Sequence, residues 1–295
     1  MHRLYVRFFD VGWDERVGRA APIGTIRFRD TSFRAFVVAP VVFITNETLL
    51  HLDTAAVGPL AAHIGGLVSK VQEQNGLSPA GELQLDCDWT VTTRERYFLL
   101  LRDIRRWLDD HQQQRCLLSA TIRLYPCKYR SAMGVPPVDK GLLMCYNMGD
   151  LKDPAARNSI LETAELEKYT ASLAGYPLPL DVALPIFDWK VLFHRDRYAG
   201  LVESLPASSL RNSAVGFKEN TYTFIRDTIL DRYAFAAGDR LRDEQSELSV
   251  IQATAAVVAR RLKAPPENVV LFHLDSANLA KYSIHELETV FDRFY

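Results

Sequence analysis

The stretch GELQLDCDWT, residues 81–90, carries the pattern on which the fold prediction depends. An apolar run typical of a buried strand ends in two aspartates, Asp86 and Asp88. Alternate residues of a strand face opposite sides of a sheet, so we expect Asp86, Asp88 and Thr90 on one face and Trp89 on the other. Two carboxylates buried together are costly unless they share a proton or have hydrogen-bond donors nearby. This strand end is therefore a candidate functional site.

Similar apolar segments recur along the whole chain. The other expected strands are residues 4–11, 23–28, 36–46, 117–125, 141–149, 180–189 and 268–275. Helices are expected at residues 55–75, 92–111, 159–173, 246–262 and 283–294. Thr92 with Glu95, and Ser283 with Glu286, have the spacing of capping boxes at helix starts. Strands that are apolar on both faces and alternate with helices are typical of a parallel sheet covered on both sides.

This alternation predicts an α/β protein with a (β/α)8 TIM barrel, in one domain that spans residues 1–295. An open doubly wound sheet is the alternative, but such a sheet usually has a glycine-rich nucleotide turn after its first strand. The first strand here ends in FDVGWDERVG, which has no GxGxxG motif, so we favour the barrel. Residues 191–229 predict an extra helix and one or two strands, inserted before the last helix and strand of the barrel.

The composition argues against several classes of function. The chain has 35 basic and 36 acidic side chains and a net charge of -1, whereas a nucleic-acid-binding protein would have a basic surplus. Its four cysteines form no CxxC pair, and there is no HxH or HExxH motif, so we expect neither a metal nor a cofactor. No apolar run approaches the about 18 residues of a membrane span. We expect export to the periplasm or cell surface if a leader has been removed, and a cytoplasmic protein otherwise.

Three motifs at strand ends, taken in their order along the chain, resemble those of one enzyme family. DCDW (residues 86–89) is similar to part of the fourth-strand motif DxxDxDxE of family-18 glycoside hydrolases, the chitinase-like barrels. MCYN (residues 144–147) is similar to the sixth-strand motif MxYD, and FHLD (residues 272–275) to the eighth-strand sequence WSLD. The resemblance spans roughly residues 83–275 and is that of a divergent, bacterial branch of the family.

The sequence departs from this family at the residues that carry its chemistry. The resemblance implies a glutamate that protonates the leaving oxygen while the acetamido carbonyl of the substrate attacks. Thr90 stands at the position of that glutamate, Leu83 at the first acidic position, and Asn147 at the aspartate of the sixth strand. A threonine hydroxyl is far too weakly acidic to donate that proton near neutral pH. We therefore expect the family's own mechanism to be absent.

Three other acids are candidate catalytic residues, namely Asp86, Asp88 and Glu47. Glu47, just past a predicted strand in FITNETLL, is the best-placed glutamate for a general acid with Asp88 as its partner. The distance between two such carboxyl groups predicts the stereochemistry, with about 5 Å for retention and about 6.5–9.5 Å for inversion. The alternative is that Glu47 is an exposed residue in the first turn of a helix capped by Thr45 or Asn46.

Other polar and aromatic residues at strand ends are candidate substrate contacts. They are Asp10, Arg123, Tyr146, Asn147, Asp188, Trp189 and Asp275. We expect Arg123 to keep the nearby aspartates ionised and to lower their pKa values. Asp10 has the alternative role of an ion-pair partner of Arg7, and Trp189 is either a sugar platform or a core residue. The polar loop 126–141 is expected to shape a substrate cleft.

These patterns predict a carbohydrate-active protein whose partner is an oligosaccharide or a polysaccharide. The first hypothesis is a glycoside hydrolase that uses acids other than the family's glutamate. The second is a glycan-binding barrel without catalysis, and the third is a scaffold protein in which polar strand ends only stabilise the fold. Glu47 distinguishes the first two hypotheses, because an enzyme needs an acid near Asp88. Exposed aromatic residues near the strand ends distinguish the second from the third.

Overall fold

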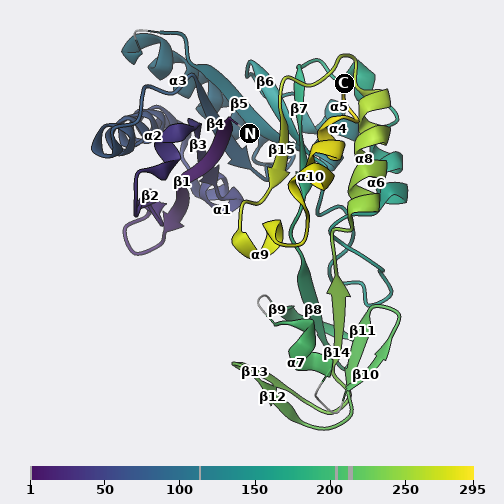
Figure 1. Cartoon of the computed structure of the whole chain (residues 1–295). Helices are drawn as coiled ribbons and strands as arrows, with labels where there is room; N and C mark the ends of the chain where they lie inside the picture. Colours follow the sequence, from purple (N-terminus) through teal and green to yellow (C-terminus); the bar gives the residue numbers. More distant parts are fainter. Residues whose placement is uncertain (1, 113, 203–204, 212–214) are drawn as a thin grey trace. The chain divides into compact units, whose positions relative to one another are not determined.

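The chain forms two compact units of strands and helices (Figure 1). The computed structural model describes residues 2–112, 114–202, 205–211 and 215–295. Unit 1 comprises Met1–Leu143 with Gly175–Asp181, and unit 2 comprises Met144–Ala174 with Val182–Tyr295. The single domain expected from the sequence stays a prediction.

The strands of unit 1 form a largely parallel sheet. They are β1 (Arg3–Asp14), β2 (Arg19–Ile23), β3 (Val37–Ile44), β4 (Glu82–Cys87), β5 (Leu117–Arg123) and β6 (Lys140–Met144), which ends at the unit boundary. Their order is β6-β5-β4-β3-β1-β2. The pairs β1–β3, β3–β4 and β4–β5 are parallel, whereas β2 is antiparallel to β1. The carboxyl ends of β1, β3, β4 and β5 therefore lie at one edge of this sheet.

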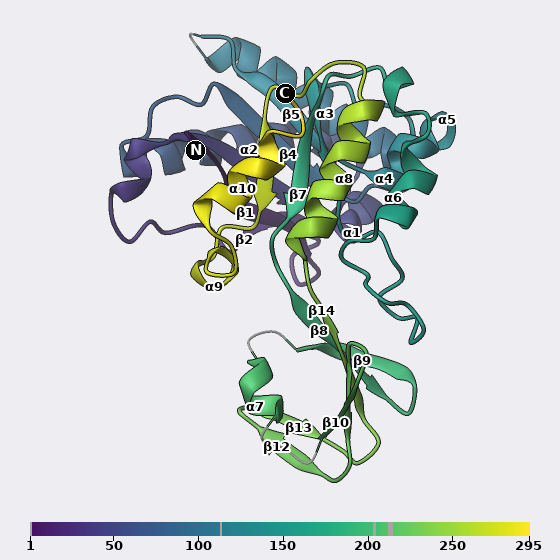
Figure 2. The ribbon, with the colours of Figure 1, turned by 45° about the vertical axis from the view of Figure 1, so that its right-hand side comes forward.

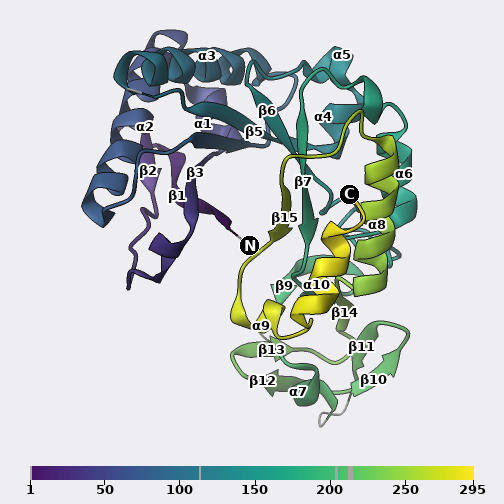
Figure 3. The ribbon, with the colours of Figure 1, turned by 45° about the horizontal axis from the view of Figure 1, so that its top comes forward.

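Helices cover the apolar face of this sheet. They are α1 (Asn46–His51), α2 (Thr54–Asn75), α3 (Arg94–His111), α4 (Leu124–Lys128) and α5 (Arg130–Met133), with a 3-10 turn at Ser32–Ala35. The long helices α2 and α3 pack against each other (Figure 3). Leu85 and Cys87 of β4 are buried, and the Tyr97 hydroxyl of α3 donates to the Leu85 carbonyl at 3.4 Å. Because side chains alternate along β4, its apolar residues point toward α3 and its polar residues point to the other face.

Unit 2 pairs β7 (Leu180–Pro185), from Val182 onward, with β15 (Val269–Phe272) in parallel. Its helices are α6 (Thr163–Thr170), α8 (Leu248–Arg261), α9 (Ser276–Leu279) and α10 (Ile284–Phe291), and a 3-10 turn lies at Leu173–Gly175. Helix α8 packs against both α6 and α10. Ser283 and Glu286 form the predicted capping box at the start of α10. The α/β class predicted from the sequence is confirmed.

A small β-rich segment is inserted between β7 and α8 (Figure 2). Its elements are β8 (Trp189–His194), β9 (Arg197–Val202), α7 (Ala207–Arg211), β10 (Val215–Lys218), β11 (Thr221–Phe224), β12 (Thr228–Leu230), β13 (Tyr233–Phe235) and β14 (Arg240–Glu244). The antiparallel sheet has the order β10-β11-β14-β8-β9, and β12 pairs with β13. It encloses its own apolar core, which includes Tyr222, Phe224, Phe235 and Leu241. An insertion at this place was predicted, but it is longer and contains more strands than expected.

Two local predictions are wrong. The strand expected at residues 23–28 lies earlier, at Arg19–Ile23, and turns back along β1. The capping box expected from Thr92 and Glu95 is absent, because α3 begins one residue later with Thr93 as its N-cap.

Candidate functional site

Of the two aspartates of the opening stretch, Asp86 lies on the polar face of β4 and Asp88 follows directly after the strand, and both contact β5. The Thr121 hydroxyl donates to Asp86 Oδ1 at 2.6 Å. Arg123 binds both carboxylate oxygens of Asp88, with Nη2 at 2.8 Å from Oδ2. Trp89 points the other way and stacks on Tyr97 of α3, with ring centroids 5.4 Å apart. This side chain arrangement is the one that the strand alternation predicts.

The aspartates have different electrostatic surroundings. Removal from water is the largest effect on the pKa of Asp86 and raises it. The hydrogen bond from Thr121 lowers this pKa and the charge of Asp88 raises it, so that the net shift is upward. The charge of Arg123 lowers the pKa of Asp86, but its effect is smaller. Arg123 thus acts on the pKa of Asp86 in the expected direction, but desolvation outweighs its charge and the net shift is upward. The Asp88 side chain is 44% exposed and is held in its ion pair with Arg123.

Arg7 and Asp10 lie on β1 and form an ion pair, the alternative that the sequence left open for Asp10. Residues three apart normally face opposite sides of a strand. A bulge between Arg7 and Phe9 shifts the alternation by one residue and brings the two side chains together. The Arg7 guanidinium lies over the ring of Phe43 on β3 at 4.7 Å, and its charge lowers the pKa of Asp86.

Glu47 is exposed in the first turn of α1. Thr45 is the N-cap of this helix, and its side chain accepts from the Thr48 backbone N–H at 3.2 Å. An acidic residue here stabilises the positive end of the helix dipole. Glu47 thus has the helix-start position that the sequence offered as the alternative to a general acid.

Thr90, at the position of the family's glutamate, is part of the turn that leads into α3. Its hydroxyl lies 2.8 Å from that of Thr92 and 3.2 Å from that of Thr93. Its backbone N–H also donates to Thr93 Oγ1 at 2.9 Å, and Thr93 Oγ1 donates to Asn46 Oδ1 at 2.7 Å. These contacts organise the turn, and no acidic group stands at this position.

A buried ion network lies at the opposite, amino-terminal ends of the strands, and sequence reasoning missed it. Lys140 Nζ lies 3.0 Å from Glu82 Oε2 and 2.9 Å from Asp181 Oδ2, and Arg3 Nη1 donates to Glu82 at 2.7 Å. Burial raises the pKa of Tyr5, whose hydroxyl donates to Glu82, to about 12. The only sequence signal is a charged residue at the start of β4, of β6 and of β7. This end of a barrel serves stability rather than catalysis.

Unit 2 holds an aromatic cluster around Tyr146. The buried Tyr146 ring is parallel to that of Phe272, with centroids 5.0 Å apart, and meets Phe187 edge-on at 5.9 Å. Asn147 is exposed and has a left-handed backbone conformation, with its N–H bonded to the Ile160 carbonyl at 2.8 Å. Tyr146 is therefore fixed by ring packing, whereas the Asn147 side chain lies at the surface.

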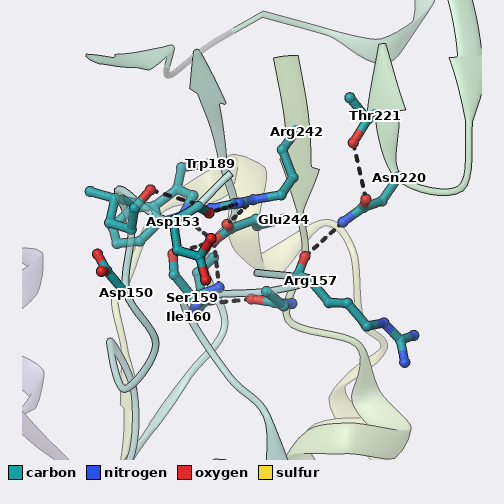
Figure 4. A network of polar contacts seen from close by, with 12 residues as sticks. Asp150, Asp153, Arg157, Ser159, Ile160, Trp189, Asn220, Thr221, Arg242 and Glu244 are labelled. Carbon is teal, nitrogen blue, oxygen red and sulfur yellow. Dashed lines mark hydrogen bonds and ion pairs between the residues drawn. The ribbon is translucent and has the colours of Figure 1, made fainter. Parts of the chain in front are cut away.

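Trp189 is held by a network of polar contacts between the inserted segment and the loop after β6 (Figure 4). Its indole N–H donates to Glu244 Oε2 at 2.7 Å. The same oxygen accepts from the Ser159 backbone at 2.9 Å, and Glu244 Oε1 accepts from Arg242 Nε at 2.7 Å. Arg242 also donates to the Asp153 carbonyl at 2.7 Å. Glu244 was not among the sequence candidates, and its place on a β-strand of the insertion gave no signal.

The two remaining sequence candidates make structural contacts. Asp188 accepts from the Ser246 backbone at 2.9 Å and forms an ion pair with Lys281 at 2.7 Å. Asp275 is the N-cap of α9 and accepts from the Ala277 backbone at 2.8 Å. In the described part of the chain, no group of three or more His, Cys, Asp or Glu residues could hold a metal. Within the same residues, no helix is long and apolar enough to span a membrane.

Comparison with solved structures identifies the fold. A chitinase from Chromobacterium violaceum superposes with a TM-score of 0.63 at 13% identity, over 98% of this chain and 91% of that one. The chain has the chitinase fold. A family-18 chitinase from Cycas revoluta in complex with (GlcNAc)3 gives a TM-score of 0.54 at 12% identity, over 100% of this chain and 93% of that one. A chitinase-like agglutinin from Robinia pseudoacacia gives a TM-score of 0.51 at 15% identity, over 100% of this chain and 94% of that one.

The chitinase fold confirms the barrel architecture and, at the level of the fold, the chitinase-like resemblance that the sequence motifs predicted. At 12–15% identity the likeness concerns the fold, since such sequences share few residues. No model of a protein family matches the sequence, and no curated protein matches it. Two of these neighbours are named chitinases, and the third is named a chitinase-like agglutinin.

Proposed function

We propose that this protein acts on carbohydrates and hydrolyses glycosidic bonds with Asp86 and Asp88 in place of the family's glutamate. The observation that carries the proposal is the difference in surroundings between these two aspartates. They share one strand face at the carboxyl end of β4, where barrel enzymes have their active sites. One is desolvated with a raised pKa, and the other is in an ion pair with Arg123. Two carboxyl groups with different surroundings are the arrangement that acid–base chemistry requires.

In this proposal Asp86 is the general acid and Asp88 is the general base. Because its pKa is raised, Asp86 retains a proton at a higher pH than an ordinary aspartate does. Asp86 donates this proton to the leaving oxygen. Both side chains lean toward β5, where Thr121 bonds Asp86 and Arg123 bonds Asp88. The distance between the two carboxyl groups sets the stereochemistry, with about 5 Å for retention and about 6.5–9.5 Å for inversion. In this proposal Arg123 orients Asp88.

A second candidate function is glycan binding without hydrolysis. The turn built around Thr90 favours it, since no acid stands where the family has its glutamate. The exposed position of Glu47 at a helix start supports the same view. In this case Asp88 and Arg123 would serve as hydrogen-bond partners of sugar hydroxyl groups, and the aromatic residues would provide stacking surfaces. The two functions share a ligand class, an oligosaccharide or a polysaccharide, and differ only in turnover.

Turnover of a panel of aryl glycosides separates these functions. We expect hydrolysis by the wild type, a loss of about 100-fold or more for Asp86→Asn and Asp88→Asn, and no loss for the control Asp30→Asn. Asp30 is an exposed aspartate before the 3-10 turn at Ser32–Ala35, where it accepts a hydrogen bond from the Ser32 backbone N–H. Its replacement controls for the effect of an Asp-to-Asn substitution away from the site. If the wild type binds chito-oligosaccharides but cleaves none of the glycosides, the binding function is supported and hydrolysis is contradicted. Equal turnover by Asp86→Asn and the wild type would contradict the proposed acid.

A further inference from the structure

Two large aromatic side chains are exposed directly after the strand that carries Arg123. Tyr125 is 55% exposed and Tyr129 is 41% exposed. Their ring centroids lie 4.5 Å apart with the ring planes tilted by 45°. The two exposed rings therefore lie side by side, and they are called here the tyrosine pair. Exposed aromatic pairs need an explanation, whereas single exposed apolar residues do not.

The local sequence explains why both rings face outward. Helix α4 begins at Leu124, directly after the last residue of β5, and has Arg123 as its N-cap. Leu124 and Cys127 point into the protein and are buried. Tyr125 and Tyr129 are four residues apart, a spacing that places side chains on one helix face. The burial of one face of α4 thus directs the tyrosine pair to solvent.

The backbone that carries the tyrosine pair is hydrogen-bonded on both sides of Tyr129. The Tyr129 N–H donates to the Tyr125 carbonyl at 2.9 Å, and the Ala132 N–H donates to the Tyr129 carbonyl at 3.0 Å. Arg130, the next residue, donates to the Gly175 carbonyl. Lys128 Nζ lies 5.2 Å from the centre of the Tyr129 ring, as in a cation–π contact. A preorganised aromatic surface loses little conformational entropy when a ligand binds.

The tyrosine pair also lies close to the candidate site along the chain. Consecutive Cα atoms are about 3.8 Å apart, so the Cα of Tyr125 lies within about 7.6 Å of that of Arg123. Arg123 itself is bonded to Asp88. A ligand that contacts Asp88 and extends along the carboxyl ends of the strands would meet these rings next. Both features belong to unit 1.

We propose that Tyr125 and Tyr129 form a sugar subsite, on which a pyranose ring of a longer glycan stacks beyond Asp86 and Asp88. The C–H face of a pyranose ring packs on an aromatic face, and the phenol hydroxyl at the wet edge bonds sugar hydroxyl groups. This inference rests on the proposed function, because it extends that site by one subsite. The inference predicts that the tyrosine pair strengthens the binding of long oligosaccharides and does not change the binding of short ones.

Calorimetric titration with chito-oligosaccharides and cello-oligosaccharides of increasing length tests this subsite. For Tyr125→Ala and Tyr129→Ala we expect about two- to tenfold weaker binding of the longest oligomers, and unchanged binding of disaccharides. Tyr125→Phe keeps the aromatic face and is expected to retain most of the affinity. Phe217→Ala is the matched control, since Phe217 is 59% exposed and lies in a ring pair with the same 4.5 Å spacing on the inserted segment.

The outcomes distinguish this inference from the proposed function. If the wild type binds oligosaccharides but the Tyr125→Ala/Tyr129→Ala double variant binds every length equally well, the tyrosine pair is not a subsite while the proposed function stands. If the wild type binds none of the oligomers, both the subsite and the proposed function are wrong. A loss for disaccharides as large as the loss for long oligomers would also overturn the subsite, because it would indicate a general structural effect.

Discussion

Asp86 and Asp88 are identical in chemistry, share one face of β4 and differ in their neighbours. Thr121 gives Asp86 one neutral hydrogen bond, whereas Arg123 gives Asp88 a charged, two-point contact. Desolvation disfavours the charged form of a carboxyl group, and a single neutral donor compensates only part of that cost. The raised pKa of Asp86 follows from this balance. The strand alternation places the two acids, but the residues on β5 decide their roles.

The raised pKa of Asp86 has a consequence for stability. A carboxyl group whose pKa is higher in the folded than in the unfolded state favours folding at low pH, and this contribution is lost as pH rises through the folded-state pKa. We therefore expect Asp86→Asn to raise the melting temperature at pH 8 by a few degrees, because the substitution removes a desolvated charge. The gain should vanish near pH 4.

Thermal unfolding at the two pH values, with Asp30→Asn as control, checks this prediction. Hydrogen bonds from Ser32 lower the pKa of Asp30, so its charged form is favoured and its replacement should bring no gain at pH 8. A lower melting temperature for Asp86→Asn at pH 8 than for the wild type would show that the charged form of Asp86 is stabilising. The assignment of Asp86 as the proton donor would then lose its basis.

At the scale of elements, the inserted segment and the loop after β6 are joined by one buried carboxylate. Glu244 is fully buried, and its ion-pair partner Arg242 is 3% exposed. Trp189, Ser159 and Arg242 all donate to this carboxylate, and Arg242 also bonds the backbone of the loop. The position of the Trp189 ring therefore depends on residues at the far end of the insertion in the sequence.

Replacing one member of this buried network should be costly. For Glu244→Ala we expect a loss of about 3–5 kcal/mol in the free energy of unfolding, because the Arg242 charge remains buried without its partner. Urea denaturation of the variant measures this loss. The control Glu247→Ala removes an exposed glutamate three residues further on and should change stability by less than about 0.5 kcal/mol. Similar values for both variants would mean that the network does not stabilise the inserted segment.

The elements that the sequence failed to predict have weak local signals. The hairpin β8–β9 turns at Arg195 and Asp196, both with positive φ, where glycine or asparagine would be the usual signal. Residues 117–125 read as one apolar strand, but β5 ends at Arg123 and α4 begins at Leu124. The spacing of Tyr125 and Tyr129 was a signal for that helix. Long apolar segments were predicted well because their core face is fixed by burial.

At the scale of the whole molecule, the order of strands and helices determined the fold prediction. Eight apolar segments with helices between them predicted a barrel, and the chitinase fold confirms it despite 13% identity. One of the eight was misplaced, since β2 runs antiparallel to β1. The aspartates at the end of β4 were found from alternation alone. The buried network around Glu82 and Lys140 could not be, because its members come together only when four strands are assembled.

The most direct test of the account is the binding of the wild type and Asp88→Asn to an array of glycans. The account predicts that the wild type binds at least one class of glycan and that Asp88→Asn binds it at least about tenfold more weakly, a difference of about 1.4 kcal/mol. Equal binding by both proteins would place the sugar elsewhere, and binding to no glycan by the wild type would contradict the carbohydrate function itself.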